Sequence, residues 1–484
     1  MMKRYLTHLV LGLTLIFLAS LHIQAQNNSN SDTTKILIIH TNDMHAKIDN
    51  FGKLAYLADS LRKICPYVFL VSSGDNFTGN PVVDMVPDKG YPMIDLMNKV
   101  GFTVSAIGNH EFDLGQTFLN LRRNQAKFPF ISCNIDAAGS ELKPVQPFII
   151  VKAGDIEIPF LGVIELGPNG LPDSHPDHMK GIKFSNGLDK ALEYKWLKKQ
   201  YGILIGVTHL GVDDDKKLAG NMSEFDLILG GHSHTIIDKP MIINGVLIVQ
   251  AGSGLKYAGI TTLLVYHKHI IDCKDKLVAL TDLKKSNTEI QTLIDRYNIN
   301  PELDQIIAVA DEDITGASEL GSLMCDAITS RLHVDIALQN IGGIRVPLIA
   351  KGAIRLKDIY RLDPFGNQVV KYLMKGDEIS SLICNAFNRE KRLDLEVSGL
   401  KYTINTDPEG KCNKVNLFTD AGKPLDLQKE YSVCINSYMA ASYTFNHKDA
   451  GISLFTTTSQ VLIDFLKFRK NVNYKGVTRI SINN

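Results

Sequence analysis

The sequence predicts an α/β protein of two domains, with polar, metal-binding side chains gathered where several strands end. Three observations lead to this prediction. The chain has 484 residues, more than one ordinary hydrophobic core organises. Its first half alternates short apolar runs with segments of helical spacing, as layered α/β domains do. Several apolar runs stop at Asp, Asn or His, which a core strand does not need at its end.

The first 25 residues have the pattern of a secretory signal peptide. Lys3 and Arg4 give a positive start, an apolar run over Leu9–Leu21 follows, and Ala25 closes a small-residue cleavage pattern. The apolar run is too short to span a bilayer, and no later run is long and apolar enough. We therefore predict cleavage near Ala25 and a mature protein that is periplasmic or secreted.

Five apolar, strand-like runs in the first domain end at residues able to bind a metal. These are Ile36–His40 before Asp43 and His45, Val68–Ser72 before Asp75, Val104–Ile107 before Asn109 and His110, Ile203–Val207 before His209, and Leu227–Leu229 before His232 and His234. Strand carboxyl ends are where open α/β sheets bind ligands, so we expect these side chains to meet. Any one motif alone is commonly structural, for example as a helix cap, but five together indicate one centre.

Several segments between these runs have apolar residues at the spacing of an amphipathic helix. Helices are predicted at Phe51–Lys63, Tyr91–Val100 and Gln116–Asn124, and β segments at Pro147–Glu165 and Gly245–Val265, which gives a first domain over residues 33–276. Residues 277–310 show little strand pattern and predict a helical linker. A second α/β domain is predicted over residues 311–484, with a helix at Leu320–Arg331 and strands at Val334–Leu338, Ile359–Val370 and Tyr431–Ile435.

The candidate metal ligands outnumber what one ion needs. They are Asp43, His45, Asp75, Asn109, His209, His232 and His234. Seven ligands suit two divalent ions that share a carboxylate, and two such ions favour displacement at phosphorus. The chain has no C-x-x-C motif, so the ligands are nitrogen and oxygen atoms, which suit zinc, manganese or a similar ion without selecting one.

His110 and Asp113 form a second kind of candidate site. His110 directly follows a candidate ligand and therefore points elsewhere in the site, and Asp113 can keep its imidazole protonated. A protonated imidazole facing a leaving group is a general acid, which contributes about 10²–10⁴-fold to a rate.

The amino-acid composition indicates which binding partners are improbable for this chain. Lys+Arg and Asp+Glu both count 52, and this balance argues against a dedicated binder of nucleic acid polymers. The cysteine count of seven is odd, so pairing within the chain is incomplete, and Cys412 with Cys434 is one candidate disulfide.

The segments TNDMH, GDN, GNHEFD, THLG and GGHSH resemble the sequence blocks of the calcineurin-like metallophosphoesterases, and specifically those of the 5′-nucleotidase branch. The resemblance implies a four-layer α/β/β/α sandwich followed by a substrate-binding α/β domain. It implies one ion on Asp43, His45, Asp75 and His234, and another on Asp75, Asn109, His209 and His232. By the same resemblance, His110 and Asp113 form the catalytic dyad.

The resemblance also places a nucleotide site on the second domain. Asn340 and Gly342 belong to a Gly-rich turn that lets backbone approach a ligand, and Arg345 can clamp a phosphate bidentately. Phe365 and Tyr438 resemble the two aromatic residues that sandwich a base, each stack contributing about 1–3 kcal/mol. The cleft between the domains is expected to close by rotation about the linker.

Two segments depart from the family pattern. Ala441–Phe445 stands where the family has a Gly-Gly-Asp-Gly stretch that contacts ribose, and Gly316–Glu319 lacks an arginine found there in relatives. The metal motifs are intact, so the sequence predicts a phosphohydrolase for nucleoside 5′-monophosphates, with nucleotide sugars and cyclic nucleotides as further candidate substrates. The alternatives are a metallophosphoesterase for a non-nucleotide ester and a nucleotide-binding protein without turnover. The sequence leaves the oligomeric state open.

Overall fold

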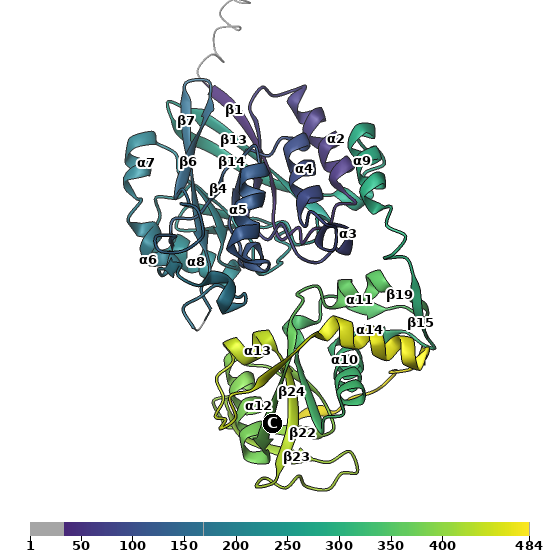
Figure 1. The fold of residues 1–484 in the computed structure, drawn as a ribbon. Coiled ribbons are helices and arrows are strands. Elements are labelled where there is room, and N and C mark those ends of the chain that lie inside the picture. Colours follow the sequence, from purple (N-terminus) through teal and green to yellow (C-terminus); the bar gives the residue numbers. More distant parts are fainter. Residues whose placement is uncertain (1–32, 168, 484) are drawn as a thin grey trace, which may run out of the picture.

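The computed structural model describes residues 33–167 and 169–483, which form two α/β lobes (Figure 1). The signal peptide predicted for residues 1–25 lies outside the described residues. Over the described ranges, no helix is both long and apolar enough to cross a membrane.

The first lobe is built on two six-stranded sheets, in the orders β14-β13-β1-β2-β3-β4 and β11-β12-β10-β9-β7-β6. The first sheet contains β1 (Thr33–Thr41), β2 (Val68–Ser72), β3 (Val104–Ala106), β4 (Phe130–Ile131), β13 (Tyr257–Tyr266) and β14 (His269–Ala279). The second contains β6 (Phe148–Ala153), β7 (Ile156–Ile164), β9 (Ile205–His209), β10 (Leu227–Leu229), β11 (Met241–Ile243) and β12 (Val246–Val249). A separate short pair consists of β5 (Ile135–Asp136) and β8 (Lys183–Phe184). The five predicted runs are β1, β2, β3, β9 and β10, which confirms them as strands.

Helices cover the outer face of each sheet (Figure 1). On the first sheet these are α2 (Phe51–Arg62), α4 (Tyr91–Val100), α5 (Gly115–Gln125) and α9 (Thr288–Asn298), with the short α3 (Pro81–Asp84) after β2. On the second they are α6 (Gly187–Leu192), α7 (Trp196–Tyr201) and α8 (Val212–Asn221). Ile38, Val71, Phe160 and Val207 are fully buried between the two sheets. The order helix, sheet, sheet, helix confirms the four-layer sandwich.

Parallel pairing determines where the loops of this lobe emerge. β1, β2 and β3 are parallel neighbours, and so are β7, β9, β10 and β12. Parallel neighbours release their following loops at the same edge of a sheet. The polar residues after these strands are thereby brought to one end of the sandwich.

The segment 277–310 differs from the predicted helical linker. It is helical in α9, whereas β14 continues to Ala279 and β15 (Ile306–Ala310) pairs with β19 (Gly352–Arg355) of the second lobe. α9 packs on α2, so it belongs to the first lobe. The connection between the lobes is the shorter stretch between α9 and β15, and the predicted domain limits at residues 276 and 311 stay predictions.

The second lobe is built on a five-stranded sheet in the order β21-β17-β24-β20-β25. These strands are β17 (Ile336–Asn340), β20 (Gln368–Lys375), β21 (Leu395–Ser398), β24 (Glu430–Asn436) and β25 (Ile452–Thr457). The smaller sheets add β16 (Ile314–Thr315), β18 (Leu348–Ile349), β22 (Lys401–Thr406), β23 (Cys412–Phe418), β26 (Asn471–Val472) and β27 (Ile480–Asn483). The helices are α10 (Gly316–Leu332), α11 (Leu356–Leu362), α12 (Gly376–Glu390), α13 (Ser437–Ser442) and α14 (Thr458–Arg469).

Two predictions for this lobe are wrong. The strand predicted at Ile359–Val370 is instead the end of α11, a turn and the start of β20. The helix begins where Asp358 Oδ2 accepts a hydrogen bond from the Arg355 backbone N–H at 2.8 Å, which outweighs the apolar pattern. Cys412 forms a disulfide with Cys384, because α12 lies beside β23, while Cys434 is a buried free thiol in the central strand β24.

Candidate metal centre and active-site cleft

All seven residues predicted to hold metal lie together at the carboxyl ends of the strands. In one group, His45 Nε2 lies 3.0 Å from His234 Nε2 and 3.9 Å from Asp75 Oδ2. His234 Nε2 is also 3.5 Å from Asp43 Oδ1. The ligand atoms of Asp43, His45 and His234 all lie within 4.8 Å of one another, close enough to surround one ion.

A second group lies on the other side of Asp75. His209 Nε2 is 3.1 Å from Asp75 Oδ2 and 3.1 Å from Asn109 Oδ1. Asn109 Oδ1 is also 3.1 Å from His232 Nδ1. Asp75 therefore faces both groups, in the position that a carboxylate shared between two ions requires.

The backbone of these residues is unusual. Asp43, His45, Asp75, His232 and His234 all have φ between 46° and 75°, in the left-handed region. This conformation costs an L-residue about 1–2 kcal/mol, and functional sites are where such strain accumulates. The sharp left-handed turns direct these side chains inward directly after each strand.

Backbone carbonyl groups orient two of the imidazoles. His45 Nδ1 lies 3.1 Å from the carbonyl oxygen of Thr78, and His209 Nδ1 lies 2.6 Å from that of Ser73. If Nδ1–H donates to the carbonyl, the Nε2 lone pair faces the centre, as in many metal sites.

The protonation pattern of these groups is mixed. Burial would lower the pKa of His209, but Asp75 and Asp43 raise it to about 10, so this imidazole must lose a proton to bind a metal. Burial raises the pKa of Asp43 to about 7, although His209 opposes this. Burial would also raise the pKa of Asp75, but His209 and His110 hold it well below its usual value. Burial lowers the pKa of His232 and His234 to about 4, which leaves both imidazoles neutral. Buried carboxylates beside neutral imidazole nitrogens are the donor set of divalent metal sites.

Glu111 supports this centre and was missed as a site residue. It is fully buried, and its Oε2 accepts hydrogen bonds from the backbone N–H groups of Asp75 at 2.9 Å and Gly108 at 2.6 Å. Its Oε1 accepts another from the Asn76 N–H at 2.8 Å. Glu111 thereby joins the loops after β2 and β3, and its position in GNHEFD was the only signal in the sequence.

His110 and Asp113 are paired as expected, with His110 Nδ1 2.6 Å from Asp113 Oδ2. Burial would lower the pKa of His110, but Asp113 and Asp75 outweigh it and raise this pKa to about 9. His110 Nε2 lies 4.0 Å from Asp75 Oδ2, so the imidazole borders the candidate metal centre. Ser174, which the sequence did not single out, donates a hydrogen bond to Asp113 Oδ1 at 2.9 Å.

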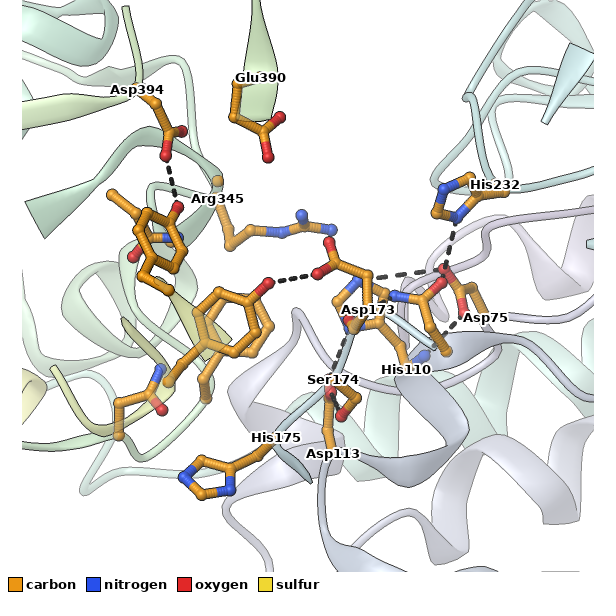
Figure 2. Close-up of a pocket in the computed structure, with 18 of the residues that line it drawn as sticks. Asp75, His110, Asp113, Asp173, Ser174, His175, His232, Arg345, Glu390 and Asp394 are labelled. Carbon is orange, nitrogen blue, oxygen red and sulfur yellow. Dashed lines mark hydrogen bonds and ion pairs between the residues drawn. The ribbon is translucent and has the colours of Figure 1, made fainter. Parts of the chain in front are cut away.

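A cavity of about 350 Å³ lies between the lobes and joins these groups to the second lobe (Figure 2). All five predicted substrate-binding residues line it, namely Asn340, Gly342, Arg345, Phe365 and Tyr438. Arg345 reaches across from the second lobe, and its Nη2 is 3.4 Å from His45 Nε2. Tyr443, from the stretch that departs from the family pattern, also lines the cavity. So do side chains that the sequence did not single out, including Asp173, Glu390, Arg392 and Asp394. They lie in loops or at helix ends, where no periodic pattern marks them.

The two predicted base-stacking residues have other partners in this conformation. The Phe365 ring stacks on His110 with a centroid separation of 5.7 Å, and the Arg345 guanidinium lies 5.5 Å from the Phe365 centroid. Tyr438 contacts Tyr443 edge-on at 6.1 Å. Their role in base stacking stays a prediction.

Known proteins with similar sequences and structures contain the same two kinds of domain. The calcineurin-like phosphoesterase profile matches residues 36–235, and the 5′-nucleotidase C-terminal domain profile matches residues 303–445. A 5′-nucleotidase of Vibrio cholerae is 26% identical, with 86% of each chain covered. The solved structure of a 5′-nucleotidase precursor from Thermus thermophilus superposes with a TM-score of 0.83 at 25% identity, covering 93% of this chain and 99% of that one.

Some relatives are much longer. Endonuclease YhcR of Bacillus subtilis is 26% identical over 86% of this chain, but the match covers 38% of that protein. For the trifunctional nucleotide phosphoesterase protein YfkN of the same species the covered share is 34%. The chain thus spans little more than a third of these two relatives.

The profile match of the first lobe, together with its clustered Asp and His side chains that could hold a metal ion, defines its class as that of the calcineurin-like metallophosphoesterases. The domain that follows it specifies the branch. The chain belongs to the 5′-nucleotidase family.

Proposed function

We propose that this chain is an exported two-metal 5′-nucleotidase, which hydrolyses nucleoside 5′-monophosphates to a nucleoside and phosphate. One observation carries the proposal: four candidate ligands, the His110–Asp113 pair and Arg345 all line one cavity between the lobes. The names of the relatives from Vibrio cholerae and Thermus thermophilus support the substrate class. Export rests on the signal-peptide pattern of residues 1–25.

Two divalent ions would be held by the seven clustered side chains. One would bind Asp43, His45, Asp75 and His234, and the other Asp75, Asn109, His209 and His232. When bound, the ions would supply Lewis acidity toward the phosphoryl group and a water molecule of lowered pKa. Zinc, manganese or a similar ion suits nitrogen and oxygen donors.

Arg345 would bind the phosphate group of the substrate. Its guanidinium reaches from the second lobe to the candidate metal centre, where a phosphate bound by the ions would lie. A planar guanidinium can donate to two phosphate oxygens at once, which fixes the orientation of the ester.

His110 would protonate the leaving group. As a water oxygen bonds to phosphorus and the ester P–O bond breaks, the Nε2 proton of His110 would pass to the departing 5′-oxygen. Asp113 holds Nδ1 at 2.6 Å, so it orients the ring and stabilises its charged form. Phe365 stacks on the ring and helps to exclude water from it.

A second candidate function is hydrolysis of a non-nucleotide phosphate ester. It is favoured by the far end of the cavity, where Glu390 and Asp394 provide carboxylates and Tyr443 donates a hydrogen bond to Asp394. The stretch Ala441–Phe445 itself has no carboxylate for a ribose. A polar leaving group other than a nucleoside would use the same metal centre.

The deciding experiment is hydrolysis of a panel of esters by residues 26–484, with the products of each ester separated and quantified by chromatography. The panel contains AMP, UDP-glucose, 2′,3′-cyclic AMP, a sugar phosphate and p-nitrophenyl phosphate, each with Mn²⁺, Zn²⁺ or chelator. Metal-dependent kcat/KM highest for AMP supports the nucleotidase. A higher value for the sugar phosphate supports the second candidate, and nucleotide binding without any hydrolysis supports a binding protein.

A further inference from the structure

The segment Asp173–Ser174 lies where the two lobes and the catalytic pair meet. Both residues line the cavity, in the loop that follows β7, and Figure 2 shows them between Arg345 of the second lobe and the His110–Asp113 pair. Neither residue belongs to the motifs that identify the metal centre.

The side chain of Asp173 contacts the second lobe. Its Oδ1 accepts hydrogen bonds from the Tyr438 hydroxyl and, at 3.3 Å, from Arg389 Nη2. Arg389 also donates to the Tyr438 hydroxyl oxygen at 3.0 Å, so the three groups form a closed cluster. Tyr438 lies in the first turn of α13, and Arg389 lies near the end of α12.

The rest of the segment contacts the first lobe. The backbone carbonyl of Asp173 accepts a hydrogen bond from Asn109 Nδ2 at 3.0 Å. This contact turns Asn109 Oδ1 toward His209 and His232, both at 3.1 Å. The next residue, Ser174, donates to Asp113 Oδ1 at 2.9 Å, on the oxygen opposite the one that holds His110.

From these contacts we infer that Asp173 and Ser174 are positioning residues that couple closure of the cleft to the alignment of the catalytic pair. Contact of Tyr438 and Arg389 with Asp173 fixes the segment. The fixed segment then holds Asp113 through the Ser174 hydroxyl and Asn109 through the Asp173 carbonyl. General-acid geometry is therefore completed only when the second lobe is in place, and this inference rests on the proposed role of His110.

The chemistry of each contact supports the inference that this segment orients Asp113 and Asn109. Asp113 has two oxygens, and a second donor on Oδ1 restricts rotation of the carboxylate that orients His110. Asn109 could present either its oxygen or its nitrogen to the centre, and the carbonyl of Asp173 selects the oxygen. Both effects act on orientation and contribute no group to the reaction itself.

The Ser174 contact predicts a dependence on the leaving group. Hydrogen bonds to charged groups contribute about 1.5–3 kcal/mol, so Ser174→Ala should lower kcat on AMP roughly 10- to 100-fold. p-Nitrophenyl phosphate needs little protonation of its leaving group, so its kcat should fall less than about threefold. Ser174→Thr keeps the hydroxyl and should restore AMP turnover. The control Ser60→Ala removes a hydroxyl bonded only within α2 and should leave both esters unchanged.

The coupling is tested by a double-mutant cycle. Tyr438→Phe keeps the ring and removes only the hydroxyl that meets Asp173, and should lower kcat on AMP. In the Ser174→Ala background the same change should cost much less, because both act through one segment. Additive losses in the cycle, or equal losses of Ser174→Ala on both esters, would overturn the inference.

Two readouts do not depend on turnover. NMR of ¹⁵N-labelled histidine should show the His110 Nδ1 signal, assigned with His110→Gln, shifted and broadened in Ser174→Ala. Spin labels at exposed Lys99 and Lys414 should report a wider separation of the lobes in Tyr438→Phe. An unchanged Nδ1 signal and an unchanged separation would contradict the inference even if AMP proved to be no substrate, whereas His110→Ala kinetics test the proposed function separately.

Discussion

At the scale of single residues, the candidate ligands combine burial with strain. Five of the seven have left-handed backbone, and Asp43, Asp75 and His209 are almost completely shielded from solvent. Without a bound cation, both features lower the stability of the fold, because buried carboxylates and left-handed L-residues are unfavourable. Bound cations would offset the charge, so the fold and the metals should stabilise each other.

Substitution should separate metal binding from proton transfer. Asp75→Ala removes the carboxylate that faces both groups of ligands and should lower the content of both metals, measured by mass spectrometry of the dialysed protein.

His110→Ala should keep the metals and lower kcat about 10²–10⁴-fold on AMP, with a smaller loss on p-nitrophenyl phosphate. An equal loss on both esters would count against His110 as the general acid.

At the scale of elements, the loop after β3 has no room for a side chain at Gly108. Gly108 has φ of −99°, which alanine adopts readily, but a Cβ there would lie 2.3 Å from Asp75 Oδ1. Gly108→Ala should therefore displace Asp75 and weaken metal binding at least tenfold, as measured by calorimetric titration. The control is Gly220→Ala in α8, where a Cβ meets nothing within 4 Å and helix propensity favours alanine. Wild-type metal affinity in Gly108→Ala would show that the loop can shift without cost.

Glu396 on β21 predicts a pH dependence of stability in the second lobe. Burial raises its pKa to about 7, opposed by the Ser318 hydroxyl, which donates to Oε1 at 3.0 Å. Because the folded-state pKa exceeds the unfolded value, the protonated form favours folding. This contribution is complete below about pH 4.5 and is lost as pH rises through 7. The loss is on the order of 2–3 kcal/mol.

Glu396→Gln should remove that dependence while retaining the oxygen that accepts from Ser318. Thermal unfolding of the variant and the wild type should nearly coincide at pH 5 and differ at pH 8, with the variant more stable. Other buried carboxyl groups titrate in both proteins, so the difference between the two curves isolates Glu396. A difference that does not grow between pH 5 and pH 8 would contradict the assignment.

The elements also show what the sequence could and could not predict. The strands β1, β2, β3, β9 and β10 were predictable because each is a local apolar run with a chemically distinctive end. α11 was misread, because the capping contact of Asp358 outweighs an apolar pattern that also fits a strand. Asp173, Ser174 and Asp394 were not found, because they reach the cavity from loops whose course depends on how the lobes pack.

At the scale of the whole molecule, the candidate site exists only where the two lobes meet. The first lobe holds all the candidate metal ligands and the His110–Asp113 pair, and the second supplies Arg345 and Phe365. Phe365 stacks on His110 and Arg345 approaches His45, so the second lobe contacts both parts of the candidate site. The division predicts that metal affinity and substrate affinity can be changed independently.

Arg345→Ala is the test of that independence. It removes the guanidinium from the cavity but no candidate ligand, so metal content should match the wild type while KM for AMP rises at least tenfold. Arg345→Lys keeps the charge but not the two parallel donors, and should recover only part of the loss. Arg355→Ala, at the end of β19, is the matched control for loss of an arginine in the same lobe. If Arg345→Ala instead lost metal, the two lobes would share one binding centre, and phosphate affinity could not be assigned to the second lobe alone.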